Sequence, residues 1–131
     1  MVLLTFVRQA LVGQLITVFG DGLQSRSFTY VGDVVDALLR LAHEPRAVGD
    51  VFNIGSTGEV TIGELAERVK KMTNSASPIE KVPYDVAYEA GFEDMPRRVP
   101  DITKIQSLVG FAPKMGLDDI IRSVVEHVRQ K

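Results

Sequence analysis

The chain is organised around the stretch Ile16-Thr-Val-Phe-Gly-Asp-Gly-Leu-Gln-Ser-Arg-Ser-Phe-Thr-Tyr-Val31. Its β-branched and aromatic start predicts a strand over Ile16–Phe19. The glycines around Asp21 predict a tight turn, because glycine adopts positive φ without steric cost. A second extended segment is expected over Ser25–Val31, and it carries Arg26, whose planar guanidinium can hold a phosphate through two hydrogen bonds. From spacing alone, the alternative is an ordinary hairpin with one solvated arginine.

Length and composition indicate one ordinary globular domain. The chain has 131 residues, of which 45% are hydrophobic and 24% are charged. Its net charge of -2 provides no basic surface for nucleic acid or for a membrane. No cysteine is present, which excludes disulfides and cysteine metal sites. Met1–Phe6 lacks a basic leader and a cleavage site, and no apolar run approaches the length of a membrane span, so the predicted location is cytoplasmic.

Helical periodicity marks two segments in the first third of the chain. Val2–Leu11 places apolar residues on one side and ends at Gly13, which predicts an amphipathic helix. Asp33–His43 is also helical in pattern, but it is apolar nearly all round. Such a helix is expected to be buried on several sides. In so short a chain this pattern suggests a missing partner surface, and an uncovered apolar patch predicts a dimer or larger species.

The middle of the chain predicts a strand, a helix and a second strand. Val51–Ile54 is expected to be a short buried strand. Thr61–Glu64 has the pattern of a capping box that starts a helix, and Ile79–Val82 is expected to be a strand. Because a strand–helix–strand crossover gives parallel strands, Ile79–Val82 is predicted to pair with Val51–Ile54.

The last third is less regular. Tyr84–Pro100 is polar and contains prolines, and either a loop or a helical turn fits it; its Glu93-Asp94 pair is interpreted as part of a solvated loop. Asp101 can cap a short helix that ends at Gly110. Leu117–Arg129 has apolar residues at helical spacing and predicts a final helix.

Several ordered motifs resemble the extended short-chain dehydrogenase/reductases that act on nucleoside-diphosphate sugars. The motifs are the organising stretch continued to Asp33, Val51-Phe-Asn-Ile-Gly-Ser56, Arg97-Arg-Val-Pro-Asp-Ile-Thr-Lys104 and Leu108-Val-Gly-Phe-Ala-Pro113. They cover essentially the whole chain and are most similar to UDP-glucuronate decarboxylases, although epimerases and 4,6-dehydratases share much of them. The resemblance implies an α/β fold: a small carboxy-terminal substrate-binding domain over residues 1–131, with short strands and four to five helices and without the Rossmann half of a larger enzyme.

The resemblance also directs attention to what the chain lacks. The family's NAD site needs a glycine-rich loop between a strand and a helix, whereas Gly20-x-Gly22 leads into an extended segment. None of Tyr30, Tyr84 and Tyr88 has the lysine four residues later that would complete the family's acid/base pair. We therefore expect no catalytic residue here, and NAD bound by the complete enzyme but not by this chain alone. The isolated His43 and His127 predict no metal site.

Substrate binding remains, and the resemblance assigns residues to it. Thr17 and Phe19 match positions around the pyrimidine base, although simple core packing is an equal alternative for Phe19. Arg26 matches a diphosphate ligand, and a second comes from Arg97 or Arg98, between which spacing does not decide. Gln24 and Asn53 are secondary polar contacts. The implied partners are a UDP-sugar or related nucleotide-sugar, the Rossmann half and a second copy of the chain.

The prediction is therefore the substrate-binding portion of a nucleotide-sugar epimerase, dehydratase or decarboxylase, inactive alone. The alternative is a non-catalytic binding or self-associating module derived from the same fold.

Overall fold

The computed structural model describes residues 1–87, 89–91 and 93–131, so Tyr88 and Phe92 lie outside the described residues. Internal contacts divide the chain into two compact units. Unit 1 comprises Met1–Arg26, Val60–Arg98 and Ile121–Lys131. Unit 2 comprises Ser27–Glu59 and Val99–Ile120.

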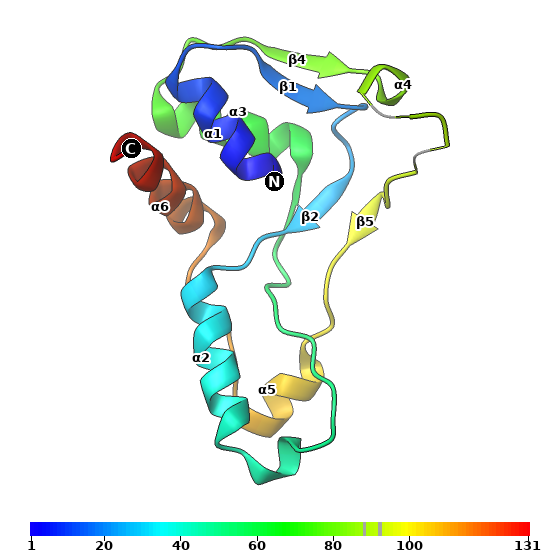
Figure 1. The fold of residues 1–131 in the computed structure, drawn as a ribbon, viewed down its shortest axis with the longest axis vertical. Coiled ribbons are helices and arrows are strands. Elements are labelled where there is room, and N and C mark those ends of the chain that lie inside the picture. The colour runs from blue at the N-terminus through cyan, green and yellow to red at the C-terminus, as the bar shows by residue number, and fades with distance from the viewer. Residues whose placement is uncertain (88, 92) are drawn as a thin grey trace. The chain divides into compact units, whose positions relative to one another are not determined.

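Unit 1 is built on a pair of parallel strands. β1 (Ile16–Phe19) pairs with β4 (Ile79–Val82), with Ile16 opposite Ile79 and Phe19 opposite Val82. Figure 1 shows α1 (Val2–Leu11) and α3 (Ile62–Thr73) side by side against these strands. The apolar faces of both helices and the inward residues of β1 form the core: Leu3, Phe6, Val7, Ala10, Ile16, Val18, Leu65, Ala66 and Val69 are buried. The predicted bounds of α1, β1 and β4 are confirmed.

The predicted pairing of Ile79–Val82 with Val51–Ile54 is wrong, because Ile79–Val82 pairs with β1. Val51–Ile54 forms no strand, and Val51 is 80% exposed rather than buried. Burial nevertheless alternates along this run, since Phe52 and Ile54 pack inward while Val51 and Asn53 are exposed. That period of two is typical of a strand. A strand also needs a neighbouring backbone, and the described residues provide none here.

A second small sheet in the order β3-β2-β5 joins distant parts of the chain. It contains β3 (Glu59–Thr61), β2 (Ser25–Ser27) and β5 (Arg97–Arg98). β2 is shorter than the predicted extended segment Ser25–Val31, because the chain enters a helix at Val31. It also does not form a hairpin with β1, since its partners are β3 and β5.

Unit 2 has a small core of its own. α2 (Val31–Ala42) and α5 (Thr103–Val109) supply Ala37 and Ile105 to a cluster completed by Ile102 and Phe111. Residues packed against this cluster are Leu41, Phe52, Ile54 and Val109. The short 3-10 helix η1 (Pro45–Ala47) follows α2.

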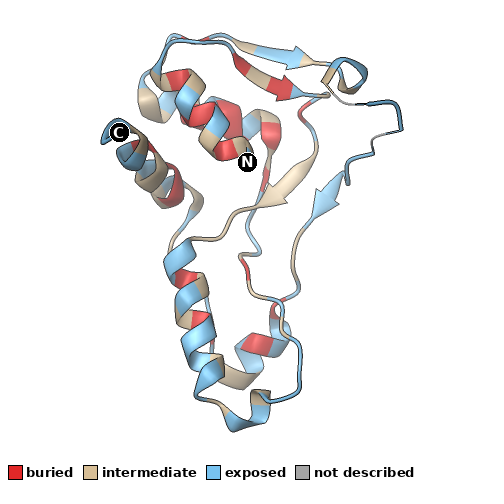
Figure 2. Cartoon of the chain, viewed as in Figure 1, coloured by how far each residue is buried: buried red, intermediate tan, exposed pale blue. Residues whose placement is uncertain are grey.

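α2 carries the uncovered apolar surface that its composition predicted for so short a chain. Figure 2 shows its surface mostly exposed, and only Asp33 and Ala37 are buried among its residues. Val35, Leu38 and Leu39 are 49%, 54% and 57% exposed. This exposure agrees with the expectation that so short a chain leaves an apolar helix without a full partner surface, because unit 2 supplies cover for one side of the helix only.

Thr61 is the N-cap of α3 as predicted, whereas Asp101 stands one residue before Ile102, the N-cap of α5. The Thr61 hydroxyl accepts a hydrogen bond from the Glu64 N–H at 3.1 Å, which is half of the predicted capping box; the Glu64 carboxylate instead pairs with Arg68. Asp101 accepts from both the hydroxyl and the N–H of Thr103 at the start of α5. These two donors hold the pKa of the Asp101 carboxyl below its usual range.

The described part of the chain contains six α-helices, one more than the upper expectation. The additional helix is α4 (Tyr84–Ala87), in the stretch for which a helical turn was one of two alternatives. The final helix α6 (Leu117–Arg129) has the predicted bounds. No described helix is both long and apolar enough to cross a lipid bilayer.

Candidate functional site

Thr17 and Phe19 lie on the edge of β1 that faces away from β4. The N–H groups of Ile16 and Gly20 donate to carbonyls at β4, at 2.9 and 2.8 Å. Because backbone donors alternate direction along a strand, the N–H groups of Thr17 and Phe19 point to the opposite edge. Phe19 is 37% exposed, so simple core packing does not describe its ring. This edge presents backbone donors and acceptors of the kind that can pair with a planar base.

Two glutamine side chains occupy this edge. Gln9 on α1 donates from Nε2 to the Thr17 hydroxyl at 3.0 Å and accepts from the Thr17 N–H at 3.2 Å. Gln24 donates from Nε2 to the Phe19 carbonyl at 3.0 Å, while its Oε1 is buried without a hydrogen-bond donor among the described residues. Sequence reasoning identified Gln24 but missed Gln9, because nothing in the helical pattern distinguishes it from a solvated glutamine.

The strand pair β2–β5 brings the three predicted arginines together. Its register places Arg26 opposite Arg98 and Ser25 opposite Arg97. Side chains of directly opposed residues project from the same face of a sheet, and neighbours along a strand project from opposite faces. Arg98 therefore shares a face with Arg26, whereas Arg97 lies on the other face. The strand register therefore distinguishes Arg98 from Arg97, which their spacing in the sequence did not.

Arg26 is the most enclosed of these arginines, with a side chain only 13% exposed. Its Nη1 donates to the Ser25 carbonyl at 2.7 Å and to the Met95 carbonyl at 2.8 Å. Its Nη2 donates to Asp94 Oδ1 at 2.5 Å. Asp94 lies in an exposed loop, as expected, but its carboxylate is also paired with Arg26. The sequence carried no signal for this ion pair, because the partners are far apart along the chain.

The glycine turn after β1 sets the position of Tyr84. Gly20 has φ +75, and a Cβ atom at that position would lie 2.4 Å from a carbon of the Tyr84 ring. The absence of a side chain at Gly20 thus lets the ring lie against the turn. The Tyr84 hydroxyl donates to Asp94 Oδ2 at 3.5 Å, a long hydrogen bond. Tyr84, Asp94 and Arg26 consequently form one chain of contacts beside the arginine face.

The glycine turn after β1 does not have the form of a dinucleotide-binding loop. Gly20 and Gly22 both have positive φ, but the turn that they form leads into β2 and not into a helix. A pyrophosphate cradle needs backbone N–H groups at the start of a helix. Within residues 1–87, 89–91 and 93–131, no group of three or more acidic or histidine side chains is arranged to hold a metal ion.

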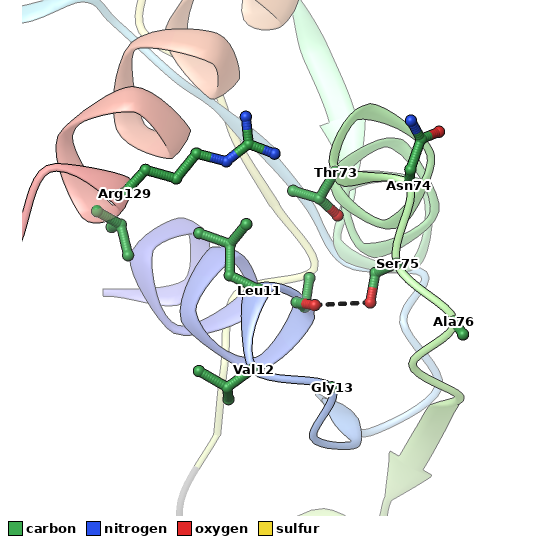
Figure 3. A pocket seen from close by; sticks show the side chains of 10 residues that line it. Leu11, Val12, Gly13, Thr73, Asn74, Ser75, Ala76 and Arg129 are labelled. Carbon is green, nitrogen blue, oxygen red and sulfur yellow. Dashed lines mark hydrogen bonds between the residues drawn. The ribbon is translucent and has the colours of Figure 1, made fainter.

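An open depression of about 570 Å³ lies elsewhere in unit 1, between the carboxyl ends of α1, α3 and α6. Figure 3 shows the Arg129 side chain reaching over it and Ser75 on the side formed by the end of α3. The Ser75 hydroxyl donates to the Ala10 carbonyl at 2.7 Å, which satisfies one of the last acceptors of α1. The depression shares no residue with the predicted substrate-binding set.

Comparison with known proteins tests the resemblance. Residues 1–55 match the model of the NAD dependent epimerase/dehydratase family. The chain is 38% identical over 125 residues to UDP-N-acetyl-alpha-D-glucosaminuronate decarboxylase of Bacillus cytotoxicus, covering 95% of the chain and 39% of that protein. It is 41% identical over 127 residues to UDP-glucuronic acid decarboxylase 4 of Arabidopsis thaliana, covering 96% of the chain and 27% of that protein.

Solved structures agree with the sequence matches. UDP-glucose 4-epimerase of Thermotoga maritima, solved with UDP-glucose, superposes with a TM-score of 0.83 and 30% identity, covering 95% of the chain and 38% of that structure. UDP-glucuronic acid 4-epimerase of Bacillus cereus, solved with UDP-glucuronic acid and NAD, superposes with a TM-score of 0.87 and 22% identity, covering 99% and 40%. The second match supports the fold alone.

These matches confirm the resemblance: the chain is similar to the NAD dependent epimerase/dehydratase family over residues 1–55 and to single members of the group over nearly its whole length. Among its relatives are the UDP-glucuronic acid decarboxylases. The predicted α/β class is also confirmed, since the fold matches the carboxy-terminal portion of these enzymes. The chain spans 39% of the Bacillus relative and 27% of the Arabidopsis relative.

Proposed function

We propose that this chain is the substrate-binding portion of an NAD-dependent nucleotide-sugar epimerase or decarboxylase, most like a UDP-glucuronate decarboxylase, and that it holds the diphosphate of UDP. The observation that supports this most directly is the opposition of Arg26 and Arg98 on one sheet face. Two like charges placed opposite each other on a sheet are unfavourable. A bound diphosphate would offset that repulsion, since it can accept charge-assisted hydrogen bonds from both arginines.

Base recognition is proposed at the neighbouring β1 edge. Gln24 connects the two places, because it follows the turn after β1, hydrogen-bonds to the Phe19 carbonyl and precedes Arg26 by two residues. A pyrimidine would exchange hydrogen bonds with the backbone at Thr17 and Phe19, where glutamine amides now lie. The exposed Phe19 ring would cover one face of the base.

Catalysis and cofactor binding are assigned to the part of the enzyme outside this chain. The glycine turn does not fit NAD, and the chain has no Tyr-x-x-x-Lys pair. We propose that NAD binds the complete enzyme and not this chain alone, and that the chain alone is inactive. Location in the cytoplasm stays a prediction.

The binding proposal is tested by substituting Arg26. The isolated chain is expected to bind UDP weakly, with a Kd of about 1 mM, or about -4 kcal/mol. Arg26→Ala should weaken binding by about 1–2 kcal/mol, because it removes charge-assisted hydrogen bonds from a partly hydrated site. Arg26→Lys should recover only part of this loss, since lysine lacks the planar fork. Chemical-shift changes in a UDP titration measure all three affinities.

Arg97→Ala provides the matched control, because Arg97 lies on the opposite sheet face from Arg26. It should weaken UDP binding less than Arg98→Ala does. Equal losses for Arg97→Ala and Arg98→Ala would contradict the assignment of Arg98. The absence of any shift at Phe19 or Arg26 at several millimolar UDP would contradict the proposed site.

Unit 2 supports a proposed contact with the rest of the enzyme. Val31, Val35, Leu38 and Leu39 are exposed at helical spacing along α2. A depression of about 450 Å³ continues this apolar surface at the end of α2, lined by Leu38, Leu41, Ala42, His43, Glu44, Pro45, Ala47, Val48, Asp50 and Phe52. Together with the strand-like run Val51–Ile54, which has no partner strand among the described residues, this surface resembles half of a packed core. We propose that the Rossmann half covers it.

In the isolated chain, we expect this surface to cause self-association. Leu38→Glu should shift the chain from a dimer or larger species toward monomer, because a charge at the centre of an apolar contact is costly to bury. Light scattering over micromolar concentrations measures this shift. Gln14→Glu adds the same charge at an exposed position of unit 1 and should change nothing. A wild-type chain that is monomeric throughout would contradict the prediction. A stable dimer that binds no UDP would favour a self-associating module.

A further inference from the structure

We propose that Asp94 competes with the diphosphate for Arg26 and thereby lowers the affinity of the site for anions. This inference rests on the proposed function, and it adds a residue that sequence patterns left in a solvated loop. In the structure the Asp94 carboxylate occupies a position on the Arg26 guanidinium that a phosphate oxygen would take. When a diphosphate binds, one of its phosphate oxygens replaces the Asp94 carboxylate on Arg26.

The geometry shows what must be exchanged. Three of the five N–H donors of Arg26 are used by the Ser25 carbonyl, the Met95 carbonyl and Asp94 Oδ1. Two of these three acceptors, Met95 and Asp94, belong to one short segment. The Met95 carbonyl accepts from Nη1 of Arg26, and the Asp94 carboxylate accepts from Nη2. They therefore occupy the terminal pair of nitrogens with which a guanidinium holds a phosphate through two bonds. The low exposure of the Arg26 side chain follows from this cover.

The ion pair between Asp94 and Arg26 has a geometry that a diphosphate can displace. Asp94 holds Arg26 through one oxygen, and its second oxygen accepts only a long hydrogen bond from Tyr84. The Asp94 side chain is 32% exposed, so water already reaches this carboxylate and reduces the cost of releasing it from Arg26. A diphosphate carries more charge and more acceptor oxygens, and Arg98 on the same sheet face adds a second cation for it. The diphosphate therefore wins the exchange, but it does so at reduced affinity.

The alternative is that Asp94 is a positioning residue, which holds the Arg26 side chain in the orientation that binds the ligand. The two roles predict effects of opposite sign. Removing a competitor tightens anion binding, whereas removing a positioning residue loosens it. Inorganic pyrophosphate is the suitable probe, because it reports on the arginines without involving the β1 edge.

The test compares Asp94→Asn with Glu93→Gln, an exposed neighbour that loses the same charge. Pyrophosphate and UDP are titrated by NMR into the whole chain at about 0.15 M salt, where charges separated by more than about 8 Å are screened. Asp94→Asn should bind pyrophosphate about threefold more tightly than wild type, as expected for loss of a weak ion pair. Glu93→Gln should stay within about 1.5-fold of wild type, since its charge is not on Arg26.

The outcomes show whether the inference about Asp94 fails alone or fails together with the proposed function. Weaker binding by Asp94→Asn would overturn the competition and make Asp94 a positioning residue. Equal gains for Asp94→Asn and Glu93→Gln would also overturn it, because general charge would then explain the effect. In both cases wild-type binding leaves the proposed function intact. Failure of every variant, including wild type, to bind pyrophosphate or UDP would overturn the inference together with the proposed function.

Discussion

Replacing Phe111 by alanine is expected to destabilise unit 2 by about 3–5 kcal/mol, which is the range for removing a buried aromatic side chain. Phe111 is 1% exposed and is the largest member of a cluster whose other buried residues are Ala37, Ile102 and Ile105. The loss is large because removing a buried aromatic ring leaves a cavity that its close-packed neighbours refill only in part.

Chemical denaturation followed through amide signals of α2 and α5 measures this loss. Leu39→Ala is the matched control, because Leu39 is apolar but 57% exposed. It should change the stability of unit 2 by less than about 0.5 kcal/mol. A Phe111→Ala variant whose α2 and α5 signals disappear at the same denaturant concentration as wild type would show that the cluster is not the core of unit 2.

Asp33→Ala is the second substitution with a large expected effect, a loss of about 2–3 kcal/mol. Asp33 is 7% exposed, and its Oδ2 accepts hydrogen bonds from the backbone N–H groups of Lys114 and Met115, both at 3.1 Å. One carboxylate thus ties the first turn of α2 to the segment that precedes α6. Alanine would leave both partly buried N–H groups without their acceptor, each at a cost near the lower end of the range of about 1–3 kcal/mol for a buried unpaired donor.

Two variants separate this role from a general effect of charge. Asp33→Asn keeps a carbonyl oxygen for both N–H groups and should lose only about 1 kcal/mol, the difference between charge-assisted and neutral hydrogen bonds. Asp36→Ala removes a carboxylate of the same helix that pairs with Arg40 on the surface, and it should lose about 0.5 kcal/mol. Denaturant midpoints provide the comparison. If Asp33→Asn were as destabilising as Asp33→Ala, the hydrogen-bond geometry would not be the cause.

The sequence by itself determined the local elements and the resemblance to nucleotide-sugar epimerases and decarboxylases. The bounds of α1, β1, β4 and α6 follow from short-range periodicity and from turn residues, because these act within a few positions of the chain. The hydrogen bond from the Thr103 N–H to Asp101 at the start of α5 and the turn at Gly20 are local in the same way. The ordered motifs identified the relatives, and with them the predicted substrate-binding residues, although the roles of those residues stay proposals.

Only the tertiary structure decided which distant segments meet. It paired β4 with β1 rather than with Val51–Ile54, placed Arg98 rather than Arg97 on the face of Arg26, and put Asp94 on the Arg26 guanidinium. Strand pairing and ion pairs between distant residues depend on how the chain closes on itself, and neither has a local signature in the sequence. The tertiary structure also decided how much of α2 is exposed. An apolar pattern predicts that a helix surface packs against another surface, and only the packing of the chain shows whether it does.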